Sequence, residues 1–346
     1  MKKNKINIGI NHQPFIIAEM SANHGNSLKN ALKLIDKAAD SGASAVKIQT
    51  FTADEMTINS SKKSFYIDDK KNLWKGQKLY KLYEKASTPR SWHKALFERA
   101  KKKNIILFST PFSENAVDFL ENFNPPLYKI ASFENNDLKL IEKVAKTKKP
   151  IIISTGMASI SQIKLIIKTI RKFSNNIIVL LKCTSSYPAP FQDLNLKTIE
   201  QMRKIFKCEV GLSDHSIGIT APILSIAYGA TVIEKHFKID EEGLDAKFSL
   251  NPNEFKKCVV ECTNAKKAIG KNYLGVVNSE KNNLKYRRSL FLIKDLKKGK
   301  KFTKENISSI RGGKGLDPKF LSNFIGKISL KNLKGPRPLS FKMIKK

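Results

Sequence analysis

Short apolar segments alternate with longer stretches of helical periodicity from residue 15 to about residue 270. The predicted strands are Phe15–Glu19, Ala45–Gln49, Ile105–Thr110, Leu127–Ala131, Ile151–Ser154, Ile177–Cys183, Glu209–Ser213 and Thr231–Glu234. The predicted helices are Ser27–Ser41, Arg90–Lys103, Ser113–Asn122, Asp137–Thr147, Ser161–Phe173, Leu196–Lys207, Ala221–Tyr228 and Pro252–Ala268. Strands that are apolar on both faces are typical of a buried parallel sheet, and eight such repeats in about 250 residues predict an α/β fold of the (βα)8 TIM barrel type. A doubly wound open sheet is the alternative, although no glycine-rich nucleotide-binding motif follows the first strand.

The character of the chain changes after the barrel pattern. Residues 270–285 are polar and irregular, and residues 286–346 carry 18 Lys and Arg against 3 Asp and Glu, with six glycines that punctuate short strand-like runs. We therefore predict a barrel domain over residues 1–270, a linker over 271–285 and a small, basic, β-rich domain over 286–346. An insertion after the second strand, residues 51–87, carries Tyr66, Trp74, Tyr80 and Tyr83 and is expected to shape the mouth of the barrel.

The formal net charge is +34, from 64 Lys and Arg against 30 Asp and Glu, yet only eight of the cations are Arg. Arg makes most bidentate contacts to bases and phosphates, so we expect no nucleic-acid partner, although the charge would attract small anions. An RNA- or membrane-binding protein that uses the basic C-terminal part is the alternative from another class. The apolar run near the N-terminus breaks at Asn11, His12 and Pro14, so we expect no signal peptide, no membrane span and a cytoplasmic protein.

Polar side chains gather at the carboxyl ends of the predicted strands, where TIM-barrel enzymes carry their chemistry. In chain order these ends hold Glu19, Lys47 with Gln49, Ser109 with Thr110, Lys129 with Ser132, Ser154 with Thr155, Ser185 with Tyr187, Ser213 with Asp214 and His215, and Glu234 with His236. Elsewhere the strands are apolar. The sequence thus predicts a reaction site at this end of the barrel.

Lys47 and Lys129 lie inside apolar strands, where an ammonium is costly unless an anion pairs with it. Together with the hydroxyls of Thr110, Ser132, Ser154, Ser185 and Ser213 they would form a cationic bowl rich in donors, which suits a phosphate and a carboxylate. The alternative is that both lysines form structural salt bridges with Glu19 and Glu234.

His215 and His236 end adjacent strands, and Glu234 shares the face of His236 because the two are two residues apart. Two imidazoles on adjacent strands could bind one divalent metal whose other positions are open to water and substrate. Hydrogen-bonding histidines or a general base remain alternatives. His12 and His93 lie outside the strand ends and are expected at the surface, and His24 could belong to either group.

Eight ordered motifs resemble the sialic acid synthase family. They are Ala18-Glu-Met-Ser-Ala-Asn-His24, Val46-Lys-Ile-Gln-Thr-Phe51, Ser109-Thr-Pro-Phe112, Tyr128-Lys-Ile-Ala-Ser132, Ile153-Ser-Thr-Gly-Met157, Lys182-Cys-Thr-Ser-Ser-Tyr-Pro-Ala-Pro-Phe191, Gly211-Leu-Ser-Asp-His215 and Glu234-Lys-His-Phe237. In addition, Arg288-Ser-Leu-Phe291 and Ser309-Ile-Arg-Gly-Gly-Lys-Gly315 resemble the family's C-terminal antifreeze-like (SAF) domain. The resemblance runs from about residue 13 to the end of the chain.

Three segments are most similar to the branch of the family that forms pseudaminic acid. They are Glu19-Met-Ser-Ala-Asn23, Ala131-Ser-Phe-Glu134 and Asp245-Ala-Lys-Phe-Ser-Leu250. The order Gly25-Asn26 and the pair Ala246-Lys247 depart from the branch pattern, and Lys247 lies beside the expected sugar contact Asp245. Branches that form N-acetylneuraminic or legionaminic acid with the same site and another N-acetylated sugar are the alternative.

The resemblance implies a transferase that condenses phosphoenolpyruvate with 2,4-diacetamido-2,4,6-trideoxy-L-altrose, giving a nine-carbon acid and phosphate. It assigns phosphoenolpyruvate binding to Lys47, Thr110, Lys129, Ser132, Ser154, Ser185 and Ser213. It implies that Glu19, Tyr187, Glu234 and Asp245 contact the sugar or move protons, and that His215 and His236 hold a divalent metal, Mn, Mg or Co. It also implies a domain-swapped homodimer in which Arg311 enters the site of the partner subunit.

Overall fold

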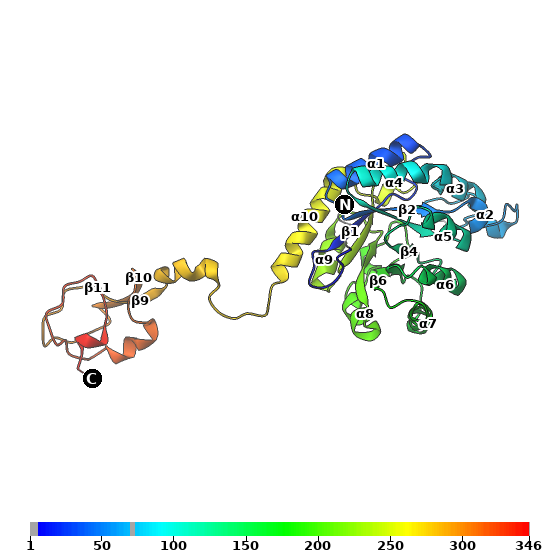
Figure 1. The fold of residues 1–346 in the computed structure, drawn as a ribbon. Helices are drawn as coiled ribbons and strands as arrows, with labels where there is room; N and C mark the ends of the chain where they lie inside the picture. The colour runs from blue at the N-terminus through cyan, green and yellow to red at the C-terminus, as the bar shows by residue number, and fades with distance from the viewer. Residues whose placement is uncertain (1–5, 70–72, 346) are drawn as a thin grey trace. The chain divides into compact units, whose positions relative to one another are not determined.

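The computed structural model of the protein describes residues 6–69 and 73–345. Eight parallel strands pair in sequence order, and β8 pairs with β1, so the sheet is a closed barrel. Its strands are β1 (Phe15–Glu19), β2 (Ala45–Thr50), β3 (Ile106–Pro111), β4 (Tyr128–Ile130), β5 (Ile151–Ser154), β6 (Ile178–Cys183), β7 (Glu209–Asp214) and β8 (Val232–His236). The helices that surround it in Figure 1 are α1 (Leu28–Asp40), α4 (His93–Lys102), α5 (Glu114–Glu121), α6 (Leu138–Lys146), α7 (Ile160–Arg171), α8 (Thr198–Phe206), α9 (Thr220–Ala227) and α10 (Pro252–Ile269). The predicted TIM barrel is confirmed.

The interior of the barrel is apolar at one end and polar at the other. Because side chains alternate along a strand, Phe15 and Ile17 point inward with Glu19, while Ile16 and Ala18 pack against the helices. The inward residues at the amino ends of the strands form one apolar cluster, made of Ile8, Phe15, Ile17, Ala45, Ile106, Phe108, Leu127, Ile152, Val179, Leu181 and Val232. The next inward residues toward the carboxyl ends carry the charges and hydroxyls. The apolar layer therefore closes the floor beneath the polar layer.

Local sequence explains where several helices begin. Ser159 accepts a hydrogen bond from the backbone of Gln162, whose side chain returns to the Ser159 backbone, and this capping box begins α7. Asn251 begins α10 in the same way, with Pro252 at the first helical position. The insertion after β2 contributes two short helices, α2 (Ala53–Met56) and α3 (Leu79–Ala86).

The chain divides after Gly270 into two compact units. The C-terminal unit holds a three-stranded antiparallel sheet of β9 (Arg288–Leu292), β10 (Ile307–Arg311) and β11 (Arg337–Pro338), with its own core around Leu290, Phe302 and Phe324. Residues Asn278–Tyr286, for which irregular chain is predicted, form a 3₁₀ helix with no buried residue. Its i→i+3 hydrogen bonds are local and need no packing partner. Among the described helices, none has the length and apolar character needed to span a bilayer.

The prediction that His93 lies at the surface is wrong. The residue is fully buried at the start of α4, where its Nε2 lies 2.6 Å from Thr50 Oγ1 and its Nδ1 lies 3.1 Å from the Pro89 carbonyl oxygen. Phe119 packs against the ring at a centroid distance of 5.0 Å. Burial lowers the pKa of His93 to about 4, so the imidazole is neutral. Helical periodicity places this side chain on the buried face of α4. The prediction considered only that His93 lies outside the strand ends.

Gly211 lies where β7 passes close to β8, and this contact generates a stability prediction. A Cβ at Gly211 would overlap the carbonyl oxygen of Val232, its pairing partner on β8. Gly211→Ala should therefore force the two strands apart and destabilise the barrel by about 1–3 kcal/mol, read as a fall in the midpoint of thermal unfolding. Lys298→Ala is the control, because Lys298 is exposed and lies in the other unit. An unchanged midpoint for Gly211→Ala would contradict the close approach.

Candidate active site

The polar layer of the barrel is built around Glu234 of β8, which lies between two buried lysines. Its Oε1 lies 3.7 Å from Lys47 Nζ and 3.4 Å from Lys129 Nζ. Lys47 also pairs with Glu19 Oε2 at 2.5 Å. All four side chains are at most 6% exposed. The two lysines thus meet in one cluster, and they pair with the glutamates that the structural alternative named.

The charges in this cluster are unequally compensated. Burial opposes the charge on Lys47, but Glu19 and Glu234 outweigh it and raise the pKa of Lys47. Burial lowers the pKa of Lys129, Glu234 offsets this only in part, and the charge of Lys47 adds to it. Burial also opposes ionisation of Glu234, but the two ammonium groups hold its pKa below the usual range. The ammonium of Lys129 is therefore short of negative charge, and an anion that entered the cluster would stabilise it.

Hydroxyl groups surround the lysines. Lys47 Nζ donates to Thr110 Oγ1 at 3.0 Å, Lys129 Nζ donates to Ser154 Oγ at 2.7 Å, and Ser213 Oγ donates to Glu234 Oε1 at 3.3 Å. The hydroxyl of Ser132 is buried without a hydrogen-bond partner. Unpaired buried donors are costly, so this hydroxyl points to a ligand atom.

The hydroxyls of Ser132 and Ser185 lie close to Gly156. A Cβ at Gly156 would come within 2.8 Å of Ser132 Oγ and 2.6 Å of Ser185 Oγ, so only glycine leaves both hydroxyls in place. Asn135 Nδ2 holds this turn by donating to the Gly156 carbonyl at 3.0 Å. Thr110 and Ser154 thus contact the two lysines and Ser213 contacts Glu234, whereas Ser132 and Ser185 lie beside Gly156.

His215 and His236 lie side by side, with ring centroids 5.3 Å apart. His215 Nδ1 lies 3.0 Å from the Thr184 carbonyl oxygen, which can only accept, so we assign the proton to Nδ1. His236 Nδ1 faces Asp245 Oδ2 at 3.4 Å. Burial opposes the charge on Asp245, but its contact with His236 outweighs this and lowers the pKa of Asp245. Burial opposes the charge on His215, but the nearby Cys183 outweighs it and raises the pKa of His215. In both imidazoles Nδ1 faces an oxygen atom, so Nε2 is the nitrogen that would bind an ion once the ring is neutral.

This arrangement fits a divalent metal. A neutral imidazole that donates from one ring nitrogen to a carbonyl or carboxylate offers the other nitrogen as a ligand. Within residues 6–69 and 73–345, no group of three or more His, Cys, Asp and Glu side chains is placed to hold a metal. His215 and His236 would therefore supply two ligands, leaving the other positions to water and substrate oxygen atoms.

Tyr187 forms an aromatic wall beside the histidines. Its ring lies 4.4 Å from that of His215 and 5.4 Å from that of Phe248, measured between centroids. Trp74 packs on its other side at 5.9 Å, so the insertion after β2 reaches the site. Arg311 is in the C-terminal unit, exposed at the end of β10.

The fold brings to the site two further titratable groups that the strand-end pattern did not predict. Burial raises the pKa of Glu134 to about 7, despite the nearby charge of Lys129, and its Oε2 has no partner. Burial opposes ionisation of Cys183, but His215, whose Nδ1 lies 4.0 Å from the thiol sulfur, outweighs it and lowers the pKa of Cys183 to about 6. Strand alternation could have placed Cys183 inside the barrel with Leu181. Glu134 ends the segment Ala131–Glu134 that resembles the family, but it lies in a loop, so no periodicity placed its carboxyl in the site.

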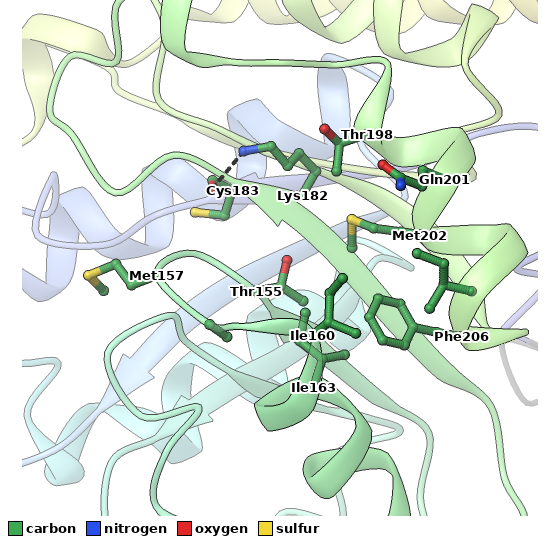
Figure 2. Close-up of a pocket in the computed structure, with 12 residues that line it drawn as sticks. Thr155, Met157, Ile160, Ile163, Lys182, Cys183, Thr198, Gln201, Met202 and Phe206 are labelled. Carbon is green, nitrogen blue, oxygen red and sulfur yellow. Dashed lines mark hydrogen bonds between the residues drawn. The ribbon is translucent and has the colours of Figure 1, made fainter.

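A separate cavity lies outside the barrel, between β6 and helices α7 and α8 (Figure 2). Its volume is about 250 Å³, and its lining is mostly apolar, with Ile163, Met202 and Phe206. Lys182 contributes to it, donating to the Cys183 carbonyl oxygen at 3.3 Å. Burial lowers the pKa of Lys182. Alternation along β6 sends the Lys182 side chain outward and the Cys183 side chain inward, and Cys183 also borders this cavity.

The raised pKa of Glu134 predicts a pH-dependent stability. The folded protein keeps the proton up to about pH 7, whereas the carboxyl's ordinary value is 4.5, so this contribution to stability is lost as the pH rises between those values. Glu134→Gln should be more stable than the wild type by about 2–3 kcal/mol at pH 8 and by under about 1 kcal/mol at pH 5 in urea unfolding. The control is Glu142→Gln, an exposed carboxyl paired with Lys146. A gain that is equal at both pH values would contradict the raised pKa.

Comparison with known proteins identifies the family. Residues 34–273 match the NeuB family, and residues 287–345 match the SAF domain. The chain is 46% identical over 330 residues to the pseudaminic acid synthase of Campylobacter jejuni, covering 95% of this chain and 96% of the relative. It is 39% identical to the N,N'-diacetyllegionaminic acid synthase of the same organism, covering 92% and 96%. Among solved structures, the N-acetylneuraminic acid synthetase of Leptospira borgpetersenii superposes with a TM-score of 0.72 at 34% identity, covering 83% of this chain and 95% of that one. The chain therefore belongs to the NeuB family and ends in a SAF domain, as its motifs predict.

Proposed function

We propose that the chain condenses phosphoenolpyruvate with 2,4-diacetamido-2,4,6-trideoxy-L-altrose to form pseudaminic acid and phosphate. One arrangement supports the proposal. The buried ammonium groups of Lys47 and Lys129 both pair with Glu234, hydroxyl groups surround them, and two imidazoles lie side by side in the same layer. The higher identity to a pseudaminic acid synthase than to a legionaminic acid synthase favours this sugar. N-acetylneuraminate or legionaminate synthesis at the same site is the second candidate.

The lysines and hydroxyls would bind phosphoenolpyruvate. Lys129 lacks full compensation and Ser132 has a free donor, so a phosphate or carboxylate gains a charge-assisted hydrogen bond from each. Lys47, Thr110, Ser154, Ser185 and Ser213 would complete the cradle. In this pose the enol lies above Glu234, whose Oε2 has no partner.

The reaction joins two molecules and releases one. His215 and His236 would hold a divalent metal, which would supply a Lewis acid for a carbonyl group. Carbon 3 of the enol forms a bond to the aldehyde carbon of the sugar, and the aldehyde oxygen takes up a proton. Water then adds to carbon 2 and loses a proton, and the tetrahedral product breaks its bond from carbon 2 to the phosphate oxygen, so that phosphate leaves and a ketone remains.

The carboxyl groups would serve different steps. Positive charge that develops on carbon 2 is stabilised by the carboxylate of Glu234, which also orients the incoming water. Glu134, with a pKa of about 7, is suited to exchange a proton with the substrate near neutral pH. Glu19, Tyr187 and Asp245 would contact the sugar and keep its aldehyde facing the enol.

Product analysis with matched lysine variants tests the assignment. The purified protein with Mn²⁺, phosphoenolpyruvate and a panel of N-acetylated hexoses should release phosphate, and mass spectrometry should find the new nine-carbon acid only with the diacetamido sugar of L-altrose configuration. Lys129→Met should lower kcat/KM for phosphoenolpyruvate by about 10²-fold or more. Lys182→Met, an outward-facing lysine, should leave it within about twofold. A product formed only from the neuraminate or legionaminate precursor would select the second candidate, and no phosphate release with any sugar would contradict both.

We also propose that the enzyme is a homodimer in which the SAF domain of one subunit completes the barrel site of the other. The segment that joins the two units exposes Tyr273 by 62% and Leu274 by 102%, and Leu284 and Tyr286 by 43% and 56%. The proposal places these exposed apolar side chains against the partner subunit. Arg311, exposed on the basic SAF domain, would bring a cation to the sugar of the partner subunit.

The four cysteines are free, which suits a cytoplasmic enzyme.

Subunit complementation tests the exchange of domains. His236→Ala and Arg311→Ala chains should each be inactive as homodimers, but when they are unfolded and refolded together, half of the dimers would hold one complete site. About a quarter of the wild-type activity should then return. A mixture of His236→Ala with Lys129→Met is the control and should stay inactive, because both changes are in the barrel. Absence of recovery in a mixed dimer whose formation is verified would contradict the exchange.

A further inference from the structure

A buried ion pair lies behind the two imidazoles, on the outer face of the barrel. Lys235 Nζ lies 2.7 Å from Asp214 Oδ2, and neither side chain is exposed at all. The two residues are direct pairing partners in the β7–β8 ladder. Each immediately precedes one histidine, so the ion pair and the imidazoles lie on opposite faces of the same two strand ends.

The ion pair also fixes the turn that follows β7. Asp214 Oδ1 accepts hydrogen bonds from the backbone nitrogen of Ser216 at 3.0 Å and from its hydroxyl at 2.7 Å. Lys235 Nζ donates to the carbonyl oxygen of Ser216. His215 is the residue between Asp214 and Ser216, and its own ring has a single hydrogen bond to a backbone carbonyl, that of Thr184. The backbone on both sides of His215 is therefore tied to β8 through one buried side chain, Lys235.

We propose that Asp214 and Lys235 are positioning residues that hold His215 and His236 at the spacing a divalent metal requires. This inference rests on the proposed metal role of the two histidines. Buried ion pairs contribute little net stability, because desolvation of both charges opposes their attraction. A strand end can be held by apolar packing as well as by charge, but apolar packing would not restrain the Ser216 turn from two directions. The ion pair therefore acts by fixing the positions of His215 and His236. Because these are the two protein ligands proposed for the metal, their spacing determines how tightly the metal binds.

Direct metal binding tests the proposal on the full chain. In Asp214→Asn/Lys235→Met both charges are removed together, so no buried charge is left alone. Titration of this variant with Mn²⁺ alone, with free Mn²⁺ read by electron paramagnetic resonance, should show a Kd about ten- to hundredfold above that of the wild type. The Mn²⁺ concentration for half-maximal activity should rise equally, while kcat at saturating Mn²⁺ stays within about threefold. This split separates positioning from a general loss of structure.

The matched control is an ion pair at the other end of the same strand. Arg203 Nη2 lies 3.0 Å from Glu209 Oε2 at the start of β7, far along the strand from the histidines. Arg203→Met/Glu209→Gln should lower the thermal midpoint but leave the Mn²⁺ Kd within about twofold. If the first double variant is insoluble, Ser216→Ala keeps both charges, removes the hydroxyl hydrogen bond to Asp214 and should shift the Kd in the same direction. An unchanged Kd in these variants, or an equal shift in the control, overturns the inference. A wild type that binds no Mn²⁺ yet forms product rejects the metal role itself, which is a distinct result.

Discussion

One carboxylate placed between two buried ammonium groups is the interaction on which the site depends. Glu234 lies within 4.0 Å of both Lys47 and Lys129, and Glu19 completes the charge balance on one side only. Lysine cannot enter an apolar barrel without such a partner. Because Lys129 stays partly uncompensated, the cluster is both stable in the closed barrel and receptive to an anionic substrate.

Because successive side chains of a strand point to opposite faces, position along the strand decides whether a side chain packs in the core or lines the site. Inward residues near the amino ends form the apolar floor, and inward residues near the carboxyl ends form the polar layer above it. The same alternation sends Lys182 to an outer cavity and Lys235 to a buried ion pair. Four lysines in similar apolar strands thus have different environments. The face of the strand on which each lies and its position along the strand decide which environment it has.

Much of this arrangement could be predicted from the chain. The period of the apolar pattern identified all eight strands, and parity placed Glu234 on the face of His236. The pairing of the lysines with Glu19 and Glu234 was named as the structural alternative. The pattern failed where a side chain comes from a loop or a helix. Glu134 follows β4 in a loop, so no periodicity located its carboxyl, and His93 is buried by the packing of α4 against the barrel. The Thr184 carbonyl that orients His215 is a backbone group, which no residue pattern can reveal.

By itself, the sequence determined the barrel, the family and the residue types at the strand ends, because these follow from local periodicity and short ordered motifs. Only the tertiary structure decided which charges meet, how far each pKa moves, and which face of β7 and β8 carries the Asp214–Lys235 pair. These properties depend on the distances between strands that are far apart in the chain and on the loss of solvent around them. A linear pattern contains neither quantity, since Coulomb and desolvation energies are set by position in the folded barrel.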